Sequence, residues 1–177
     1  MNRVTLPVFW ITGLSGAGKS TLAKALSAYC LSRGKKLIAL DGDNLREIFA
    51  VDIQDSRNYT RTSRLHLAYR YGRLGCELSK QGFPVVISTI SLFREIHEWN
   101  RKNIPAYVEI FIDVSKKELK RRDTKGLYSK LESGLISNVA GFDLKIDKPS
   151  SPDLLIQSDN FFDAEKIAEH LFETYFK

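Results

Sequence analysis

The sequence contains little sulfur and no long apolar run. Two cysteines and one methionine occur among 177 residues. Cys30 and Cys76 fall on predicted helices without the close spacing of metal ligands, so we expect buried thiols rather than a disulfide or a zinc site. No stretch approaches the roughly 20 apolar residues of a membrane-spanning helix. Only Arg3 precedes the first short apolar run, a pattern that differs from a secretion signal.

The charge balance favours a small anionic partner. The net formal charge is +6, with 43% hydrophobic and 27% charged residues, which is typical of a globular chain. Basic residues are spread along the sequence, and no block alternates them with aromatic residues as a nucleic-acid module would. We therefore expect a small phosphorylated molecule as partner, neither nucleic acid nor a membrane, and one domain over residues 1–177.

The most informative segment is the run from Gly13 to Thr21, which reads GLSGAGKST. It matches G-x-x-x-x-G-K-[S/T] and lies between an apolar run at 8–12 and a helical pattern. Small residues let backbone N–H groups approach phosphate oxygens, and the helix N-terminus adds partial positive charge. Lys19 can reach β- and γ-phosphates, and the Ser20 hydroxyl can bind Mg²⁺. The alternative is a glycine-rich turn without a ligand.

The motif predicts a nucleoside triphosphate, Mg-ATP, as ligand. The predicted ATP-binding residues of this loop are Gly13, Ser15, Gly16, Ala17, Gly18, Lys19, Ser20 and Thr21. Because ATP and free thiols both suit a reducing compartment, we expect a cytoplasmic location.

Short apolar segments alternate with helical patterns along the chain. Strands are predicted at 8–12, 36–40, 84–88, 107–112 and 153–156. Helices are predicted at 19–33, 43–50, 62–81, 93–103, 115–122 and 163–175. Apolar strands between helices indicate a parallel sheet covered on both faces. The expected fold class is α/β, a three-layer sandwich of the P-loop nucleoside triphosphate hydrolase type with a five-stranded parallel sheet.

The stretch 124–151 interrupts this alternation. It contains Gly126, Gly134, Gly141 and Pro149 among scattered charges, with weak periodicity. A segment of this length often closes over a site, so we predict a mobile lid. A plain surface excursion is the alternative.

Two carboxylates, Asp41 and Asp43, follow the strand predicted at 36–40. Ligands of open α/β sheets bind at this carboxyl edge. A kinase needs one carboxylate to orient Mg²⁺ and another to accept the proton of the attacking hydroxyl, and Arg46 could hold a substrate phosphate. The alternative is that Asp43 or Asn44 only caps the following helix.

Three segments together resemble the adenylylsulfate kinase family: GLSGAGKST at 13–21, LDGDNLR at 40–46 and RDTKGLY at 122–128. Weaker counterparts are STISLFR at 88–94 and GFD at 141–143, so the resemblance spans nearly the whole chain. Kinases of this family transfer the γ-phosphoryl group of ATP to the ribose 3′-hydroxyl of a nucleotide with a sulfated 5′-phosphate. The resemblance implies the same reaction class here.

The resemblance also implies roles for single residues. Asp43 would be the catalytic carboxylate, assisted by Lys19 and Asp41, and Asp41 would share Mg²⁺ with Ser20. The residues implied to bind the acceptor are Asp43, Arg46, Tyr59, Arg64, Ser91, Lys125 and Val139. Arg122, with Arg121 and Lys125, would stabilise the phosphates as the lid closes, which adds Arg122 to the ATP-binding set.

The acceptor side departs from the family's pattern. The family clamps the adenine of its substrate between two phenylalanines, and the corresponding residues here are Tyr59 and Val139. Leu67 and Leu92 replace an asparagine and a proline. An unchanged donor side with a changed acceptor side makes cytidine diphosphoramidate kinase, which acts in bacterial capsule synthesis, an alternative to adenylylsulfate kinase. An ATP-binding regulator without kinase activity is a second alternative, and a homodimer is left open.

Two further patterns have structural alternatives. Arg57, Arg61 and Arg64 recur at helical spacing and could form one basic face that grips a diphosphate, or only a solvated helix surface. Trp99 is predicted to pack rather than to bind a ligand.

Overall fold

The computed structural model describes residues 5–49, 51–52, 55–123 and 125–176. Its strands are β1 (Val8–Thr12), β2 (Ile38–Asp41), β3 (Val85–Thr89), β4 (Tyr107–Asp113) and β5 (Leu154–Gln157). Its helices are α1 (Lys19–Ser32), α2 (Gly42–Ile48), α3 (Arg61–Lys80), α4 (Arg94–Asn103), α5 (Lys116–Arg122), α6 (Leu127–Glu132) and α7 (Ala164–Tyr175). A short 3-10 helix, η1 (Ser56–Tyr59), precedes α3.

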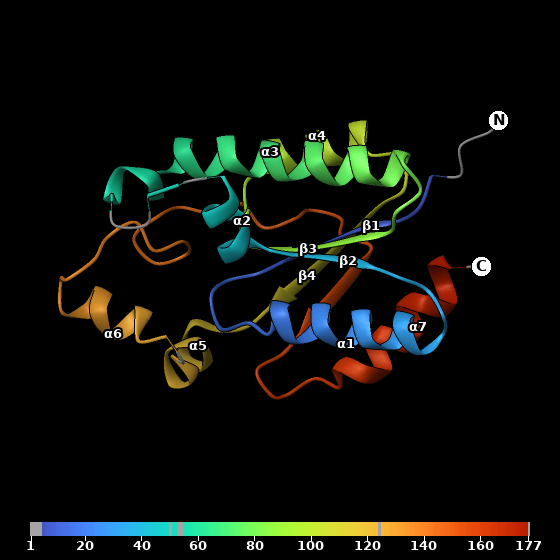
Figure 1. Ribbon diagram of the computed structural model, residues 1–177. Helices are drawn as coiled ribbons and strands as arrows, with labels where there is room; N and C mark the ends of the chain where they lie inside the picture. The colour runs from blue at the N-terminus through green and yellow to red at the C-terminus, as the bar shows by residue number, and fades with distance from the viewer. Residues whose placement is uncertain (1–4, 50, 53–54, 124, 177) are drawn as a thin grey trace.

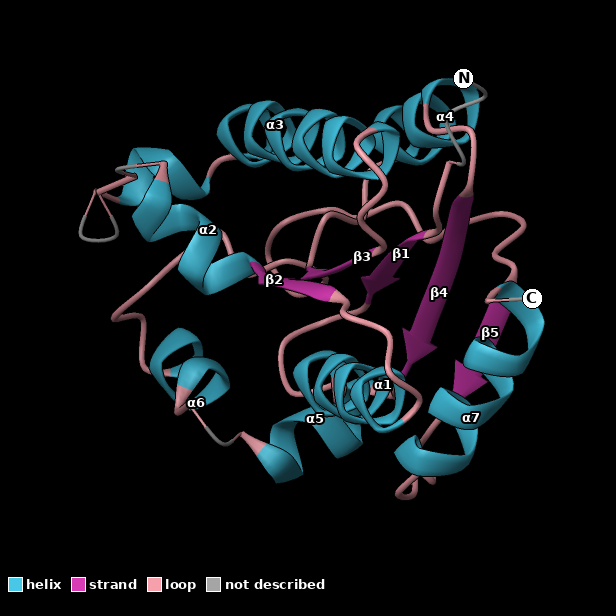
Figure 2. Ribbon diagram, turned by 45° about the vertical axis from the view of Figure 1, so that its right-hand side comes forward, coloured by secondary structure: helices cyan, strands magenta, loops and turns pink. Residues whose placement is uncertain are grey.

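The strands form a five-stranded sheet in the order β2-β3-β1-β4-β5, and every pair is parallel. Parallel neighbours need crossover connections, which helices provide here. Figures 1 and 2 show α3 and α4 over one face of the sheet and α1, α5 and α7 over the other. The predicted α/β fold with three layers is confirmed.

Each face of the sheet has its own apolar core, because side chains alternate along a strand. Phe9 and Ile11 of β1 pack in one core with Leu26 of α1 and with α7. Val8 and Trp10 point to the opposite core, which α3 and α4 complete. The central strand therefore has no exposed residue, and its carboxyl end is held in a fixed position for the loop that follows.

The predicted strands and helices agree with the structure to within one or two residues at each end. The start of α2 is set by Asp41, whose side chain accepts a hydrogen bond from the backbone N–H of Asp43 and caps the helix. Helix α6 was not predicted, because six residues are too few to show a period. It is held by tertiary contact instead: the Tyr128 ring lies 4.5 Å from the ring of Phe142.

The segment 124–151 is tied to the body of the fold in several places. Arg64 of α3 donates to the Asn138 carbonyl at 2.8 Å, and within the segment Asp143 accepts the backbone N–H groups of Asn138 and Val139 at 2.7 and 2.6 Å. At its far end, the Asp147 N–H donates to the Leu92 carbonyl at 2.9 Å. That this segment moves as a lid stays a prediction.

The proposed basic face is wrong. Arg57 lies in η1 and pairs with Asp55 at 2.8 Å, whereas Arg61, the first residue of α3, pairs with Glu95 at 2.9 Å. Arg64 donates to backbone carbonyls. The helix starts only after Thr60, whose side chain caps it, so the three arginines do not share one helical face.

Other expectations about packing hold. Both cysteines are buried and free, and burial raises the pKa of the Cys30 thiol to about 11. Trp99 packs edge-to-face against Tyr69 with ring centroids 5.8 Å apart. Over the described ranges, no helix is both long and apolar enough to cross a membrane.

Candidate active site

The phosphate loop, residues 13–18, links β1 to α1 at the carboxyl edge of the sheet. Gly13 and Gly18 have φ values of 154° and 102°, which side chains rarely adopt. A Cβ atom at Gly13 would lie 2.6 Å from the Ile112 carbonyl oxygen, and one at Gly18 would lie 2.9 Å from the Phe162 ring. The glycines of the motif are therefore required by both conformation and space.

Lys19 begins α1 and turns its ammonium group back over the loop. Its Nζ atom donates to the Leu14 carbonyl at 2.8 Å. Burial lowers the pKa of Lys19 to about 8, against the opposing effect of Asp41 and Asp43. A partly buried ammonium group that already donates to the loop carbonyl is placed to bind phosphate oxygens at the loop.

Asp41 joins the loop to the sheet. One of its oxygens accepts hydrogen bonds from the Ser20 hydroxyl at 2.7 Å and the Ser88 hydroxyl at 2.8 Å. Burial alone would raise the pKa of Asp41, but hydrogen bonds from Ser20, the Asp43 N–H and Ser88 outweigh it, and the pKa is lowered. Adjacent hydroxyl and carboxylate oxygens are the donor set that Mg²⁺ prefers, so Ser20 and Asp41 fit the predicted metal.

Asp43 is exposed at the start of α2 and meets a lysine from the segment 124–151. Lys125 Nζ lies 2.5 Å from Asp43 Oδ2, although the two residues are far apart in the sequence. This hydrogen bond raises the pKa of Lys125. The contact brings the predicted catalytic carboxylate and the predicted lid together.

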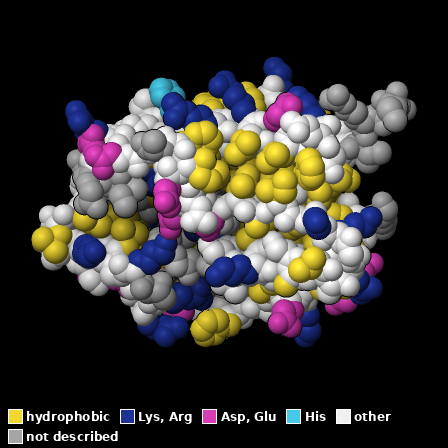
Figure 3. Space-filling view, in the orientation of Figure 1, with side chains coloured by type: hydrophobic (Ala, Val, Ile, Leu, Met, Phe, Trp, Pro, Cys, Tyr) yellow, Lys and Arg dark blue, Asp and Glu magenta, His cyan; other side chains and the backbone are white. Residues whose placement is uncertain are grey.

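A cavity of about 530 Å³ opens beside Asp43. It is lined by Asp43, Asn44, Arg46, Glu47, Val51 and Tyr59. Two guanidinium groups lie near the Tyr59 ring, with the guanidinium carbon of Arg46 5.0 Å and that of Arg64 5.2 Å from the ring centroid. Figure 3 shows Lys and Arg side chains gathered on this side of the molecule, over α5 and the beginning of α1, below α2.

The two arginines beside Tyr59 differ in their partners. Arg64 donates to the carbonyls of Tyr59 and Asn138, each at 2.8 Å. Burial and the nearby charge of Arg46 lower the pKa of Arg64 to about 10. Arg46 keeps a buried Nη1 atom that has no hydrogen-bond partner among the described residues. A buried, unpaired guanidinium nitrogen is costly, and an anion in the cavity would satisfy it.

Two residues predicted to bind the acceptor lie away from this cavity. Val139 is 4% exposed, belongs to the apolar core against which Leu14 and Phe142 pack, and is not among the residues that line the cavity. Ser91 is buried, and its hydroxyl shares a 2.9 Å hydrogen bond with Thr89.

Arg122 braces the phosphate loop from outside. Its guanidinium donates to the carbonyls of Gly16 at 3.3 Å and Ser158 at 3.1 Å, and to the Glu118 carboxylate at 2.8 Å. On the same loop, the Ser15 carbonyl accepts the Tyr128 hydroxyl at 2.7 Å. Most donors of Arg122 are thus used inside the protein, and the residue holds the loop in shape.

Sequence reasoning missed Asn44, Glu47 and Val51, which line the cavity. Glu47 could have been found, because it lies four residues after Asp43 and so on the same helical face. Val51 lies beyond α2 and gives no such signal. Of the other residues predicted to bind ATP, Ala17 is buried within the phosphate loop and Thr21 is exposed on α1.

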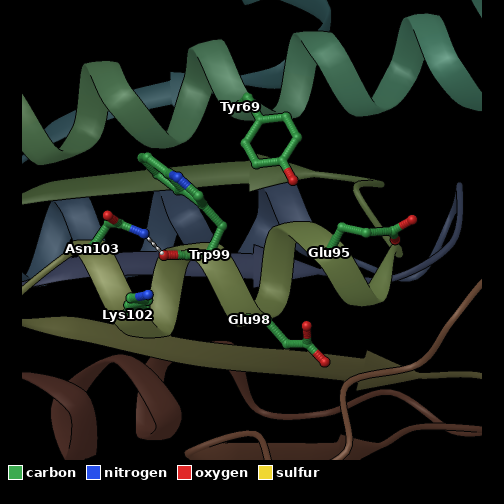
Figure 4. Close-up of a pocket in the computed structure, with 6 residues that line it drawn as sticks. All are labelled: Tyr69, Glu95, Glu98, Trp99, Lys102 and Asn103. Atoms are coloured by element: carbon green, nitrogen blue, oxygen red, sulfur yellow. Dashed lines mark hydrogen bonds between the residues drawn. The ribbon is translucent and has the colours of Figure 1, made fainter.

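A second cavity, of about 420 Å³, lies on the outer surface of α3 and α4. Tyr69 reaches from α3 toward α4, and the two glutamates extend away from Trp99 (Figure 4). Glu95 pairs with Arg61 and Glu98 with Arg94, so both carboxylates have partners. The cavity contains none of the phosphate-loop residues.

The fold, the phosphate loop and the carboxylates at the sheet edge together define a P-loop kinase. Comparison with known proteins agrees: residues 6–157 match the model of the adenylylsulphate kinase family. The chain belongs to the adenylylsulfate kinase family and is a phosphotransferase.

The chain is similar over most of its length to named kinases. It is 41% identical to the cytidine diphosphoramidate kinase of Campylobacter jejuni over 85% of each chain. It is 36% identical to the adenylyl-sulfate kinase of a Picosynechococcus species over 85% of this chain and 82% of that one. Among solved structures, the Mycobacterium tuberculosis APS kinase CysC, in complex with AMPPNP and APS, matches with a TM-score of 0.87 at 29% identity, covering 98% of this chain and 99% of that one.

Proposed function

We propose that the protein transfers the γ-phosphoryl group of Mg-ATP to the ribose 3′-hydroxyl of a nucleotide with a modified 5′-phosphate. One arrangement carries this proposal: the phosphate loop and the Asp41–Asp43 pair are joined by the Ser20–Asp41 hydrogen bond and lie beside a cavity whose Arg46 has a nitrogen without a hydrogen-bond partner among the described residues. A donor on the loop and an acceptor in the cavity would meet at Asp43.

In this reaction, the acceptor's 3′-oxygen forms a bond to the γ-phosphorus, and the bond from that phosphorus to the β,γ-bridging oxygen breaks. Asp43 accepts the proton of the hydroxyl, and ADP leaves. Lys19 holds the β- and γ-phosphates, and Ser20 and Asp41 would hold Mg²⁺, which would neutralise phosphate charge.

Lys125 has two partners in this scheme. Without substrate it pairs with Asp43 at 2.5 Å. When an anionic phosphate chain is bound nearby, Lys125 turns to the transferring phosphoryl group and leaves the carboxylate free to accept a proton. The same lysine thus pairs with the Asp43 carboxylate before the reaction and stabilises the negative charge of the transferring phosphoryl group during it.

For the acceptor, we favour a cytidine diphosphate derivative, cytidine diphosphoramidate, over adenylylsulfate. The chain is 41% identical to the cytidine diphosphoramidate kinase of Campylobacter jejuni and 36% identical to the adenylyl-sulfate kinase of Picosynechococcus. The cavity has one aromatic wall, Tyr59, and the core position of Val139 leaves no second wall to clamp a purine. The Arg46 Nη1 atom, which has no hydrogen-bond partner among the described residues, suits a 5′-diphosphate-type group.

The test is a side-by-side assay of both acceptors with Mg-ATP, read by mass spectrometry and by kcat/KM. Higher kcat/KM with cytidine diphosphoramidate supports the proposal. Efficient turnover of adenylylsulfate, with no turnover of the cytidine compound, would identify adenylylsulfate as the acceptor instead. Transfer to neither would contradict the proposed reaction.

Three wider expectations stay predictions: the cytoplasmic location, the homodimer, and the absence of nucleic-acid partners. Light scattering of the purified protein, with and without nucleotides, measures the oligomeric state directly.

A further inference from the structure

We propose that the Asn44 side chain holds the 2′-hydroxyl of the acceptor ribose and thereby leaves the 3′-hydroxyl to Asp43, an inference that rests on the proposed function. Asn44 directly follows Asp43 in α2, and both residues line the cavity of about 530 Å³. A ribose presents two neighbouring hydroxyl groups to such a cavity. Transfer to only one of them requires side chains that treat the two hydroxyls differently.

Asn44 has no structural task in the protein. Helix α2 is capped by Asp41, whose carboxylate accepts the Asp43 N–H, so the capping role that the sequence leaves open for Asn44 is already filled. The Asn44 residue is exposed, and its side chain forms no hydrogen bond or ion pair within the described part of the chain. Asparagine is also a poorer helix former than alanine. The amide group is therefore available to a ligand in the cavity.

The neighbouring side chains of Asp43 and Asn44 differ in one chemical property. A carboxylate can accept a proton, whereas an amide of nearly the same shape offers a carbonyl acceptor and two N–H donors but is not a base. A hydroxyl held by Asn44 keeps its proton and stays a poor nucleophile. A hydroxyl held by Asp43 loses its proton as its oxygen bonds to phosphorus. The pair thus activates one hydroxyl and only binds the other.

The other side chains of the cavity suit other parts of the acceptor. Arg46 keeps a buried nitrogen without a partner among the described residues, which suits the 5′-phosphates, and Tyr59 is the aromatic wall for the base. Glu47 lies four residues after Asp43, about 6 Å further along the helix axis at 1.5 Å per residue. The 2′- and 3′-hydroxyls are bonded to adjacent carbon atoms. The group that meets the 2′-hydroxyl therefore lies next to Asp43, as Asn44 does.

The experiment removes the hydroxyl and the side chain separately and then together. Calorimetry in the presence of Mg-AMPPNP gives Kd for CDP and 2′-deoxy-CDP, and for AMP and 2′-deoxy-AMP, so that both candidate bases are covered. The wild type should bind the ribonucleotide about fivefold more tightly than its deoxy form, as expected for one hydrogen bond. Asn44→Ala should bind both forms with the Kd that the wild type has for the deoxy form, because the two removals eliminate the same interaction.

Two further measurements test whether the effect is local to the acceptor. Asn44→Ala should keep the wild-type melting temperature, since its side chain makes no contact that a fold would lose. The matched control is Asn103→Ala, which changes an exposed asparagine at the end of α4 and should keep the wild-type preference for the ribonucleotide. In the transfer assay, Asn44→Ala should raise KM for the ribose acceptor about fivefold and leave kcat nearly unchanged.

Two binding results would overturn the inference. One is a wild type that binds the ribonucleotide and its deoxy form with equal Kd, and the other is an Asn44→Ala variant that keeps the wild-type preference. Neither result depends on phosphoryl transfer, which mass spectrometry measures separately. Loss of the preference in Asn44→Ala, with no transfer by the wild type, would support the contact of Asn44 with the 2′-hydroxyl and contradict the proposed reaction. A wild type that binds none of the four nucleotides would contradict both.

Discussion

The donor and acceptor sides of the site differ in how their charged groups are occupied. On the donor side, Lys19 donates to a loop carbonyl, Asp41 accepts two hydroxyls, and Arg122 binds backbone carbonyls. On the acceptor side, Arg46 keeps a buried nitrogen without a partner within the described ranges, and Glu47 lines an open cavity.

This difference suits the two substrates. A triphosphate is the same in every cycle, so a loop whose shape is fixed by internal hydrogen bonds binds it with little reorganisation. Acceptors differ between relatives of one fold, and specificity depends on the groups that remain unpaired until the right ligand arrives. Variants on the two sides should therefore fail in different ways.

The largest expected effect is on the donor side. Lys19→Ala removes the ammonium group at the phosphate loop and should lower kcat about a thousandfold, within the range known for lost transition-state donors. Lys24→Ala, an exposed lysine on the same helix, is the matched control and should keep full activity. Circular dichroism and the melting temperature check that both variants fold. A kcat near that of the wild type in Lys19→Ala would contradict the donor site.

The next effect is at the boundary of the two sides. Asp43→Asn keeps the shape but cannot accept the proton, so kcat should fall about a hundredfold or more. Kd for Mg-ATP should stay within about tenfold, because the role of Asp43 belongs to the transition state. Glu47→Gln alters a carboxylate in the same cavity and should spare kcat. Wild-type turnover by Asp43→Asn would move the proton acceptor elsewhere.

A smaller effect is expected on the acceptor side. Tyr59→Leu removes the stacking wall and should lower kcat/KM for the acceptor about tenfold, with Kd for Mg-ATP unchanged. Val139→Phe is the contrasting variant: it overpacks the core and should cost about 1–3 kcal/mol of unfolding free energy without improving acceptor use. Steady-state kinetics and denaturant unfolding measure both. Better use of adenylylsulfate by Val139→Phe would place Val139 in the cavity after all.

The last effect is a pH dependence that is confined to donor binding. Lys19 has a pKa of about 8 in the free protein, and bound phosphates raise it. Below pH 8 the lysine is already charged and affinity is full. As pH rises above 8 the free protein must take up a proton to bind, so Kd for Mg-ATP should rise by up to about tenfold per pH unit. Lys19→Arg stays charged and should bind with the same Kd at pH 7 and pH 9. If Kd for Mg-ATP of the wild type does not change over this pH range, the Lys19 ammonium group is hydrated and its pKa is not lowered by burial.

The donor side could be predicted from sequence because its chemistry is local. The glycines, Lys19 and Ser20 act within one strand–loop–helix unit, and Asp41 ends a strand whose apolar run is visible. The fold followed from the same regular alternation.

The acceptor side depends on contacts between distant segments. Lys125 reaches Asp43, and Arg64 reaches Asn138, across gaps that no local period encodes. Helix α6 escaped prediction for the same reason, since tertiary packing of Tyr128 holds it. The role of Val139 at the acceptor stays a prediction, because an alignment gives the place of a residue in the chain but not the direction of its side chain.

The strand order has a consequence for how this chain behaves at high concentration. The outer strands β2 and β5 have four residues each, the shortest in the sheet. They expose few unpaired backbone groups on which a foreign strand could add, and the exposed Lys35 and Lys36 lie just before β2. Aggregation by edge-to-edge strand pairing is therefore disfavoured, and two copies that do associate are expected to meet through side chains on helical surfaces.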